Sequence, residues 1–295
     1  VLFVDADRAT DGLSLFVLGP EGREQLASFA PESTFTGLLE VYEKTGQMQP
    51  QPHAVHRTRD HGLSYDVIIS DRYLYGDAPD SVRPTGSSID RQFERPAFQQ
   101  AVQAFFESIR ASGDYDYVLV DSRGGFSFES TDVAAAGDSF VVVTEATFTN
   151  FYQDRNLVDR IGDAATRMQR RAVLRAVIIN KSTDPGDEVE AARAAGAASS
   201  ERGEVRHREV SYRNELVREF GIRFEDTYCV ALDLEALRAY KEQKSVFRVA
   251  PASRFAYDAL QAFQRILQVV TSQWAPDRIA RWDRFSHPDN LPKYS

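Results

Sequence analysis

The stretch Tyr115–Gly125 reads YDYVLVDSRGG and joins an apolar run to an aspartate and a pair of glycines. The apolar run lacks polar alternation, which is typical of a strand buried on both faces of a parallel sheet. Asp121 follows this run directly, and ligands of α/β sheets bind just beyond the carboxyl ends of the strands. A carboxylate at that position can reach the shell of a metal ion, and the glycines allow backbone N–H groups to approach a phosphate. The alternative interpretation is a strand-to-loop turn that needs glycine only for its geometry.

Five more apolar runs, most of them also without polar alternation, are separated by segments whose apolar residues recur at helical spacing. This alternation predicts an α/β fold with a doubly wound, mostly parallel sheet and helices on both faces. The predicted strands are 1–4, 65–70, 117–120, 140–143, 173–179 and 226–232, and the predicted helices are 95–110, 150–170, 213–220 and 253–270.

Two aspartates follow the first predicted strand, in the stretch Val4–Ser14 (VDADRATDGLS). Asp5 and Asp7 come just past the strand end, where a carboxylate can hold Mg²⁺ through water or orient an attacking water. Because aspartate is also a common turn former, the alternative interpretation is a turn with solvated aspartates.

A late predicted strand ends in an amide, in the stretch Val177–Lys181 (VIINK). Asn180 can both donate and accept hydrogen bonds, so it can read the edge of a purine base. The alternative interpretation of this residue is a helix or turn cap.

In this order along the chain, the three stretches resemble motifs of the ParA/MinD group of P-loop ATPases, the deviant Walker class. The stretch at Asp5 resembles switch I, the stretch at Asp121 resembles the Walker B strand with switch II, and the stretch at Asn180 resembles the adenine-contacting loop. The resemblance covers nearly everything from Val1 to about Leu267. Further similar segments are 36–39 (TGLL), 137–144 (GDSFVVVT), 232–233 (LD) and 244–253 (KSVFRVAPAS).

The resemblance implies a P-loop NTPase-like fold, ATP and Mg²⁺ as ligands of the complete protein, and a role for each site residue. Asp7 would position the attacking water, Asp121 and Asp5 would serve the metal, Gly124 and Gly125 would meet the γ-phosphate, and Asn180 and Asp233 would flank adenine. The implied activity is an ATP-hydrolysing switch. ATP would stabilise a face-to-face homodimer, and hydrolysis would release it to control binding of a protein partner, DNA or a membrane.

The sequence departs from the family at the phosphate loop. It contains no KGGVGK[ST] motif, and Val1 already lies in what resembles the family's second strand. We therefore expect an N-terminally incomplete P-loop domain over residues 1–273, without its first strand, phosphate loop and first helix, and a separate tail over 274–295. Without the cradle that this loop provides, the chain as given is expected to bind ATP poorly and to expose the edges of neighbouring strands.

Two alternatives stay open from the sequence. A metabolic enzyme of the same superfamily, such as an amidoligase or synthetase, would need a second substrate pocket. A nucleotide-free, ATPase-like scaffold would need no phosphate loop.

Composition and charge limit the remaining possibilities. The 295 residues are 42% hydrophobic and 27% charged, which is ordinary for a globular protein with a sizeable core. The net charge of -9 gives no support to a nucleic-acid partner or to an anionic membrane surface. A single cysteine, the lack of an apolar stretch long enough to span a membrane, and a start unlike a signal peptide favour a cytoplasmic protein.

Overall fold

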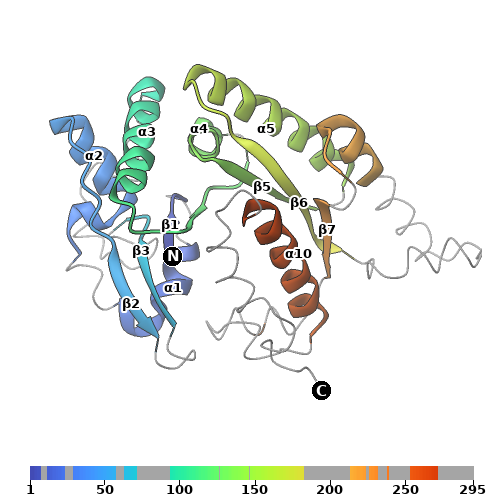
Figure 1. Cartoon of the computed structure of the whole chain (residues 1–295), viewed down its shortest axis with the longest axis horizontal. Coiled ribbons are helices and arrows are strands. Elements are labelled where there is room, and N and C mark those ends of the chain that lie inside the picture. The colour runs from blue at the N-terminus through green and yellow to red at the C-terminus, as the bar shows by residue number, and fades with distance from the viewer. Residues whose placement is uncertain are drawn as a thin grey trace, which may run out of the picture. The chain divides into compact units, whose positions relative to one another are not determined.

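The computed structural model divides the chain into two compact units (Figure 1). The first comprises Val1–Asp138 and Asp159–Ala172, and the second comprises Ser139–Val158 and Val173–Ser295. The structure describes residues 1–7, 12–23, 29–57, 63–71, 94–125, 127–145, 147–182, 213–223, 226–231, 238 and 253–271. Asp233 and the predicted tail lie outside these residues.

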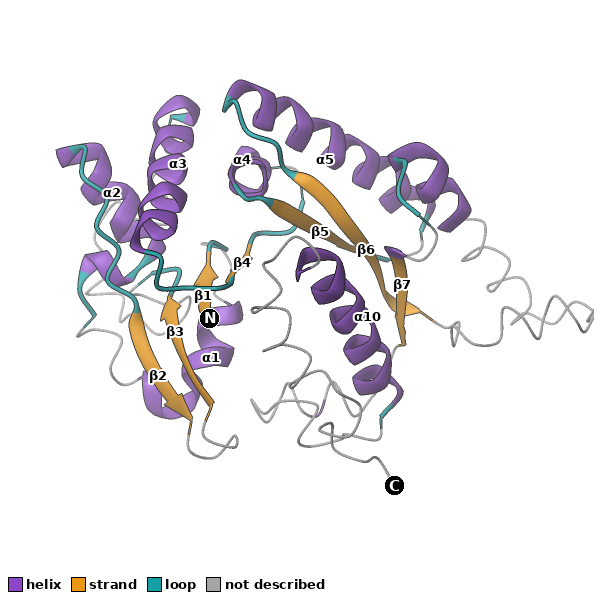
Figure 2. Ribbon diagram, viewed as in Figure 1, coloured by secondary structure: helices purple, strands orange, loops and turns teal. Residues whose placement is uncertain are grey.

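The first unit is built on a four-stranded sheet. Its elements are β1 (Leu2–Asp5), α1 (Gly12–Arg23), the 3-10 helix η2 (Pro31–Ser33), α2 (Phe35–Thr45), β2 (His53–Arg57), β3 (Leu63–Ile68), α3 (Arg95–Ser112), β4 (Val118–Asp121) and α4 (Phe128–Ala136). The strand order is β2-β3-β1-β4 (Figure 2). β1 pairs in parallel with β3 and with β4, whereas β2 pairs antiparallel with β3. Leu2 and Val4 of β1 are fully buried, as expected for a central strand covered on both faces.

Helix α3 supplies much of the aromatic core of this unit. Pro96 occupies its first turn, where no backbone N–H is needed, and Gly113 in the left-handed conformation (φ 68°) ends it. Phe98 and Phe105 lie on the buried face, and the ring of Phe105 meets that of Phe35 on α2 edge to face, with centroids 5.8 Å apart.

Helix α2 begins at a cap that requires glycine. The Thr34 side chain accepts a hydrogen bond from Gly37 N (3.0 Å). A Cβ on Gly37 would lie 2.4 Å from the carbonyl oxygen of Pro31, so a larger residue would displace the turn that leads into the helix.

The second unit is built on a three-stranded parallel sheet with the order β5-β6-β7, formed by β5 (Ser139–Thr144), β6 (Val173–Ser182) and β7 (Thr227–Ala231). Its helices are the first part of α5 (Phe148–Arg167), a helix at 213–220, and α10 (Arg254–Thr271). Val142, Val177 and Ile179 of the sheet pack with Phe151 of α5 and Leu216 of the helix at 213–220. No helix in the described parts of the chain, α10 included, has the length and apolar content needed to cross a membrane.

The structure confirms the six predicted strands, the four predicted helices and the mostly parallel α/β character. It differs from the predicted single sheet, because the seven strands fall into two sheets. The elements outside the predicted ranges include α1, α4 and β2. β2 (HAVHR) is a short antiparallel strand with polar residues at alternate positions, and α4 (FESTDVAAA) starts with hydroxyl and acidic residues that are not diagnostic of a helix interior.

Each sheet ends in a strand that presents apolar side chains to solvent. β4 ends the first sheet, and Leu119 on it is 50% exposed. β5 ends the second sheet, and Val143 on it is 63% exposed. An apolar edge strand is a template for pairing with a further strand. The exposed strand edges that the sequence predicts are therefore present in both units.

Candidate functional site

Two carboxylates emerge at the same end of neighbouring parallel strands in the first unit. Asp5 of β1 and Asp121 of β4 are partners in the strand register. Ala6 N donates a hydrogen bond to the Asp121 backbone oxygen (2.8 Å), which extends the pairing by one residue. Both side chains therefore lie at the carboxyl end of the sheet, where α/β folds bind ligands.

Asp5 ties this strand end to the helix that follows. Its carboxylate is fully buried and accepts hydrogen bonds from Ser14 N and Ser14 Oγ (both 2.7 Å) and from Asp7 N (3.0 Å). Ser14 lies in the first turn of α1, where a negative charge stabilises the helix end. Ser70 N donates to Ser14 Oγ (3.0 Å), so the second residue past the end of β3 joins the same network.

Burial changes the acidity of Asp5. Removal from water raises its pKa from 3.8 to about 6, although the hydrogen bonds from Ser14 and Asp7 oppose the increase. The negative charge of Asp121 raises the pKa of Asp5 slightly further. With a pKa of about 6, Asp5 is mostly ionised at neutral pH, and its hydrogen-bond donors offset part of the cost of its burial.

Asp7 lies close enough to Asp121 for the two charges to interact. Asp7 is buried, and its negative charge adds to partial removal from water in raising the pKa of Asp121. Asp121 itself lies on the exposed edge strand, so part of its surface remains in contact with solvent. The two neighbouring carboxylates repel each other, and a cation bound between them would relieve this repulsion.

The donor set fits a hydrated magnesium ion better than a metal held by protein alone. Among the described residues there is no group of three or more His, Cys, Asp or Glu side chains arranged to hold a metal ion. Mg²⁺ usually keeps several waters and binds through one or two carboxylates together with the phosphates of a substrate. Asp7 and Asp121 can provide those carboxylates.

The loop after Asp121 is open to solvent. Gly124 and Gly125 are exposed, and a Cβ on either would meet no atom within 4 Å. Gly125 has φ 96°, a backbone conformation that favours glycine. The start of the loop is held, because Ser130 Oγ of α4 donates to the Arg123 carbonyl oxygen (2.6 Å). The backbone of the two glycines can therefore approach a ligand while the residue before them stays attached to α4.

The predicted adenine contact differs from its expected position. Asn180 lies inside β6 and not beyond its end, since the strand continues to Ser182. It falls where the register with β7 shifts, between Ile179 and Ser182, and such bulges redirect side chains. Asn180 belongs to the second unit, whereas Asp5, Asp7, Asp121, Gly124 and Gly125 belong to the first. Asp233, the other predicted adenine contact, lies outside the described residues.

Sequence reasoning missed Ser14 and Ser70, which complete the network around Asp5. No clear signal marks Ser14, because it is the third residue of α1 and serine favours the N-cap position before a helix. No signal marks Ser70 either, since its partner is 56 residues away in the chain.

The first unit thus combines a mostly parallel sheet with two neighbouring carboxylates and a glycine loop at its carboxyl end, and several solved structures have a similar fold. McdA of Cyanothece in complex with ATP matches with a TM-score of 0.57 and 13% identity, over 91% of this chain and 84% of that one. The ParA of pNOB8 matches with a TM-score of 0.55 and 12% identity, over 92% and 88%. MinD of Pyrococcus horikoshii with Mg-ADP matches with a TM-score of 0.50 and 13% identity, over 91% and 82%.

The chain therefore has the fold of the MinD, ParA and McdA ATPases. Neither a protein-family model nor the sequence of a curated protein matches it.

Proposed function

We propose that this protein is an ATP-dependent dimerisation switch of the ParA/MinD type. The observation that supports it most is the pair Asp7 and Asp121, placed beside a glycine loop at the carboxyl end of adjacent parallel strands. In the proposed cycle, ATP stabilises a homodimer, hydrolysis releases it, and the two states differ in affinity for a partner.

Each predicted site residue has a distinct role in this proposal. Asp7 would orient the attacking water, and Asp121 would help to hold Mg²⁺. Mg²⁺, when bound, neutralises charge on the phosphates. Backbone N–H groups of Gly124 and Gly125 meet the terminal phosphate, and the loop relaxes once that phosphate leaves. Asn180 contacts adenine, as the resemblance implies.

We assign Asp5 a positioning role in place of the metal role that the resemblance implies. Both of its oxygens already accept hydrogen bonds, two from Ser14 and one from Asp7 N. A carboxylate engaged in this way holds the backbone of Asp7 and the start of α1 in place. Metal binding would require it to give up those donors.

In our proposal the phosphate cradle is supplied by polypeptide other than these 295 residues, which contain no G-x-x-x-x-G-K-[ST] motif. The open edge of β4 lies directly beside Asp121 and presents Leu119 to solvent. In our proposal a further parallel strand adds at this edge and carries the cradle.

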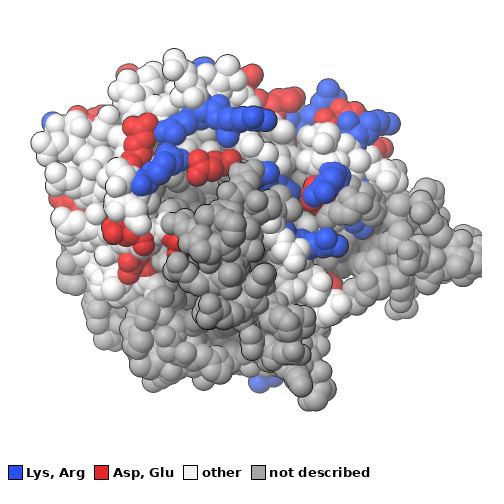
Figure 3. Space-filling model, viewed as in Figure 1, with Lys and Arg blue, Asp and Glu red and all other residues white. Residues whose placement is uncertain are grey.

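We propose a protein as the partner of the switch. The net charge is -9, and basic and acidic side chains are interspersed on the face shown in Figure 3. A nucleic-acid surface would need a larger basic field than this face provides.

The test compares the 295-residue chain with the protein made from its complete gene. We expect the complete protein to bind ATP by calorimetry and to release phosphate, and the 295-residue chain to bind ATP weakly. In the complete protein, Asp7→Ala should lower turnover by about 100-fold or more, the range for loss of a positioned proton acceptor, while ATP still binds. Asp159→Ala, an exposed carboxylate on α5, is the matched control. If the complete protein does not bind ATP, the nucleotide-free scaffold replaces our proposal, and unchanged turnover of Asp7→Ala would remove the role of that residue.

A further inference from the structure

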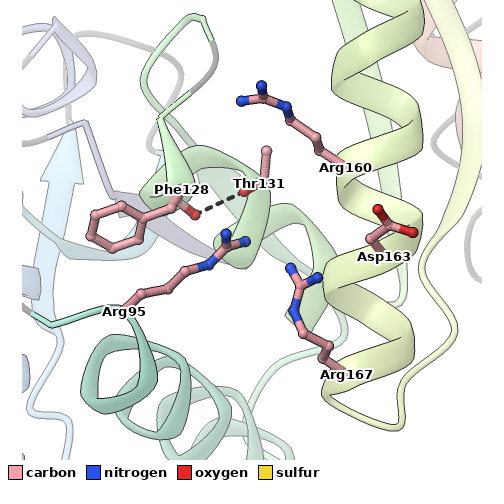
Figure 4. A pocket seen from close by; sticks show the side chains of 6 residues that line it. All are labelled: Arg95, Phe128, Thr131, Arg160, Asp163 and Arg167. Atoms are coloured by element: carbon pink, nitrogen blue, oxygen red, sulfur yellow. Dashed lines mark hydrogen bonds between the residues drawn. The ribbon is translucent and has the colours of Figure 1, made fainter.

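The first unit contains a pocket of about 220 Å³ that is separate from the paired aspartates (Figure 4). Three elements of that unit form it: the start of α3, the first turn of α4, and the part of α5 from Asp159 onward. The side chains that line it are Arg95, Phe128, Thr131, Arg160, Asp163 and Arg167. Three of these six residues are arginines.

Arg95 is fixed in place at the pocket. Its Nε and Nη2 donate to the two carboxylate oxygens of Asp132 (3.1 and 2.9 Å), and Asp132 is fully buried. Its guanidinium also lies over the ring of Phe128, 6.0 Å from the centroid. Because Arg95 still has 42% of its side chain exposed, a fixed cation faces the pocket.

The other two arginines come from α5. Arg160, Asp163 and Arg167 recur at three- and four-residue spacing and so share one face of the helix. In Figure 4 Arg160 and Arg167 extend from α5 toward α4, while Arg95 approaches from α3. Within the part of the chain that the structure describes, no hydrogen bond or ion pair engages the exposed guanidinium of Arg167.

The charges of the pocket do not cancel. Three arginines face two carboxylates, Asp132 and Asp163, and Asp132 is already occupied by Arg95. One positive charge is left over. Phe128 and Thr131 add the first turn of α4, a helix end that carries a partial positive charge.

We propose that this pocket binds a phosphate group. Arginine presents a planar fork of donors that matches phosphate oxygens. The guanidiniums of Arg160 and Arg167 line the same pocket as the fixed guanidinium of Arg95. Pockets that hold drug-sized ligands measure roughly 300–1,000 Å³, so a volume near 220 Å³ suits one phosphate with little attached to it. The ligand class is inorganic phosphate or a small phosphomonoester.

The pocket is joined to the glycine loop by the first turn of α4. Phe128 lines the pocket, and Ser130, two residues later, holds the loop through the Arg123 carbonyl oxygen. A bound phosphate would therefore act on the end of the loop that follows Asp121. This consequence for the loop rests on the proposed function, whereas phosphate binding does not.

The test is calorimetric titration of the 295-residue chain with inorganic phosphate and with glycerol 3-phosphate, at constant ionic strength set with chloride. We expect saturable binding that Arg167→Gln weakens by about 10-fold, the usual effect of losing one charge-assisted hydrogen bond. Asp163→Asn should tighten binding, because it removes the carboxylate that repels the ligand. Arg171→Gln, an exposed arginine outside the pocket, should leave binding unchanged.

The outcomes separate a built pocket from general charge attraction. Tighter binding of glycerol 3-phosphate than of inorganic phosphate would identify an organic phosphate as the ligand, and the reverse would identify the free ion. Absence of saturable binding, or equal weakening by Arg167→Gln and Arg171→Gln, would overturn the proposal. Because no nucleotide is used, this result is independent of whether the protein is an ATPase.

Discussion

The ends of two adjacent parallel strands, β1 and β4, carry the candidate chemistry in contrasting ways. At the end of β1, Asp5 is fully buried and accepts three hydrogen bonds. At the end of β4, Asp121 lies on an open edge, and the glycines that follow it are exposed. One strand end is locked into the core, and the other leads into a loop with room to move.

This contrast suggests a division of labour. A switch needs fixed groups that define where the phosphate and its metal lie, and a segment that responds when the terminal phosphate leaves. The tie between Asp5 and Ser14 supplies the fixed part, and the loop at Gly124 and Gly125 supplies the responsive part. The first three of the following predictions each test one side of the contrast, and the fourth concerns the second unit.

The largest effect is expected at the open strand end. In the complete protein, Asp121→Asn should raise the Mg²⁺ concentration needed for half-maximal phosphate release by about 10- to 100-fold, as for other groups that hold a metal through its outer shell. Folding should be retained, because the fold already disfavours the charged form of Asp121. Asp159→Asn is the control. If the Mg²⁺ concentration needed for half-maximal phosphate release does not change, Asp121 does not help to bind the metal.

The second effect concerns the buried strand end and is a dependence of stability on pH. The folded-state pKa of Asp5 is about 6, above its ordinary 3.8, so between these values the folded protein binds more protons than the unfolded chain. The free energy of unfolding should therefore fall as pH rises through this window, by about 3 kcal/mol from Asp5 alone. Asp121 contributes a change in the same direction.

Urea unfolding of the wild type and Asp5→Asn at about pH 4, 5, 6 and 7 measures this contribution. The difference in slope between the two proteins should equal the Asp5 contribution, because all other groups are shared. Parallel curves would show that Asp5 is not buried as described.

The third effect is local strain in the loop. Gly125→Ala should lower the free energy of unfolding by about 1–2 kcal/mol, because φ 96° is unfavourable for a residue with a Cβ. Gly124→Ala is a close control, since its Cβ would meet only open space and its φ is not positive. Its effect should stay within about 0.5 kcal/mol. Equal effects in thermal unfolding would mean that the loop has another conformation.

The smallest effect is expected in the second unit. Asn180→Ala should reduce the preference of the complete protein for ATP over GTP by about 5-fold, the value of one neutral hydrogen bond. Competition binding with the two nucleotides measures it. An unaltered preference for ATP over GTP would indicate that Asn180 contributes only to the structure of the bulge in β6.

The strand carrying Asp121 was predictable because an apolar run followed by an acid is visible within a few residues. The same holds for β1 and for the helical spacing of Phe98 and Phe105 on α3. Periodicity carries no information on strand order, so the division into two sheets was not predictable. The sequence likewise does not show that Asp5 is engaged by Ser14, because that contact depends on where α1 begins.

The roles of Asp5 and Asp7 show the same limit in the candidate site. Two aspartates separated by one residue are equivalent in a sequence pattern. The structure distinguishes them, because the Asp5 carboxylate is held by Ser14, whereas Asp7 lies near Asp121 and raises its pKa. In our proposal, the hydrogen bonds of Asp5 give it the positioning role, and the closeness of Asp7 to Asp121 gives Asp7 the chemical role.

The most direct test of the switch is the sedimentation behaviour of Asp7→Ala in the complete protein, with Mg²⁺ and either ATP or ADP. Loss of the water-orienting carboxylate should trap the ATP-bound state. We predict a dimer with ATP and a monomer with ADP. A monomer with both nucleotides, or a dimer with both, would contradict an ATP-controlled dimerisation switch.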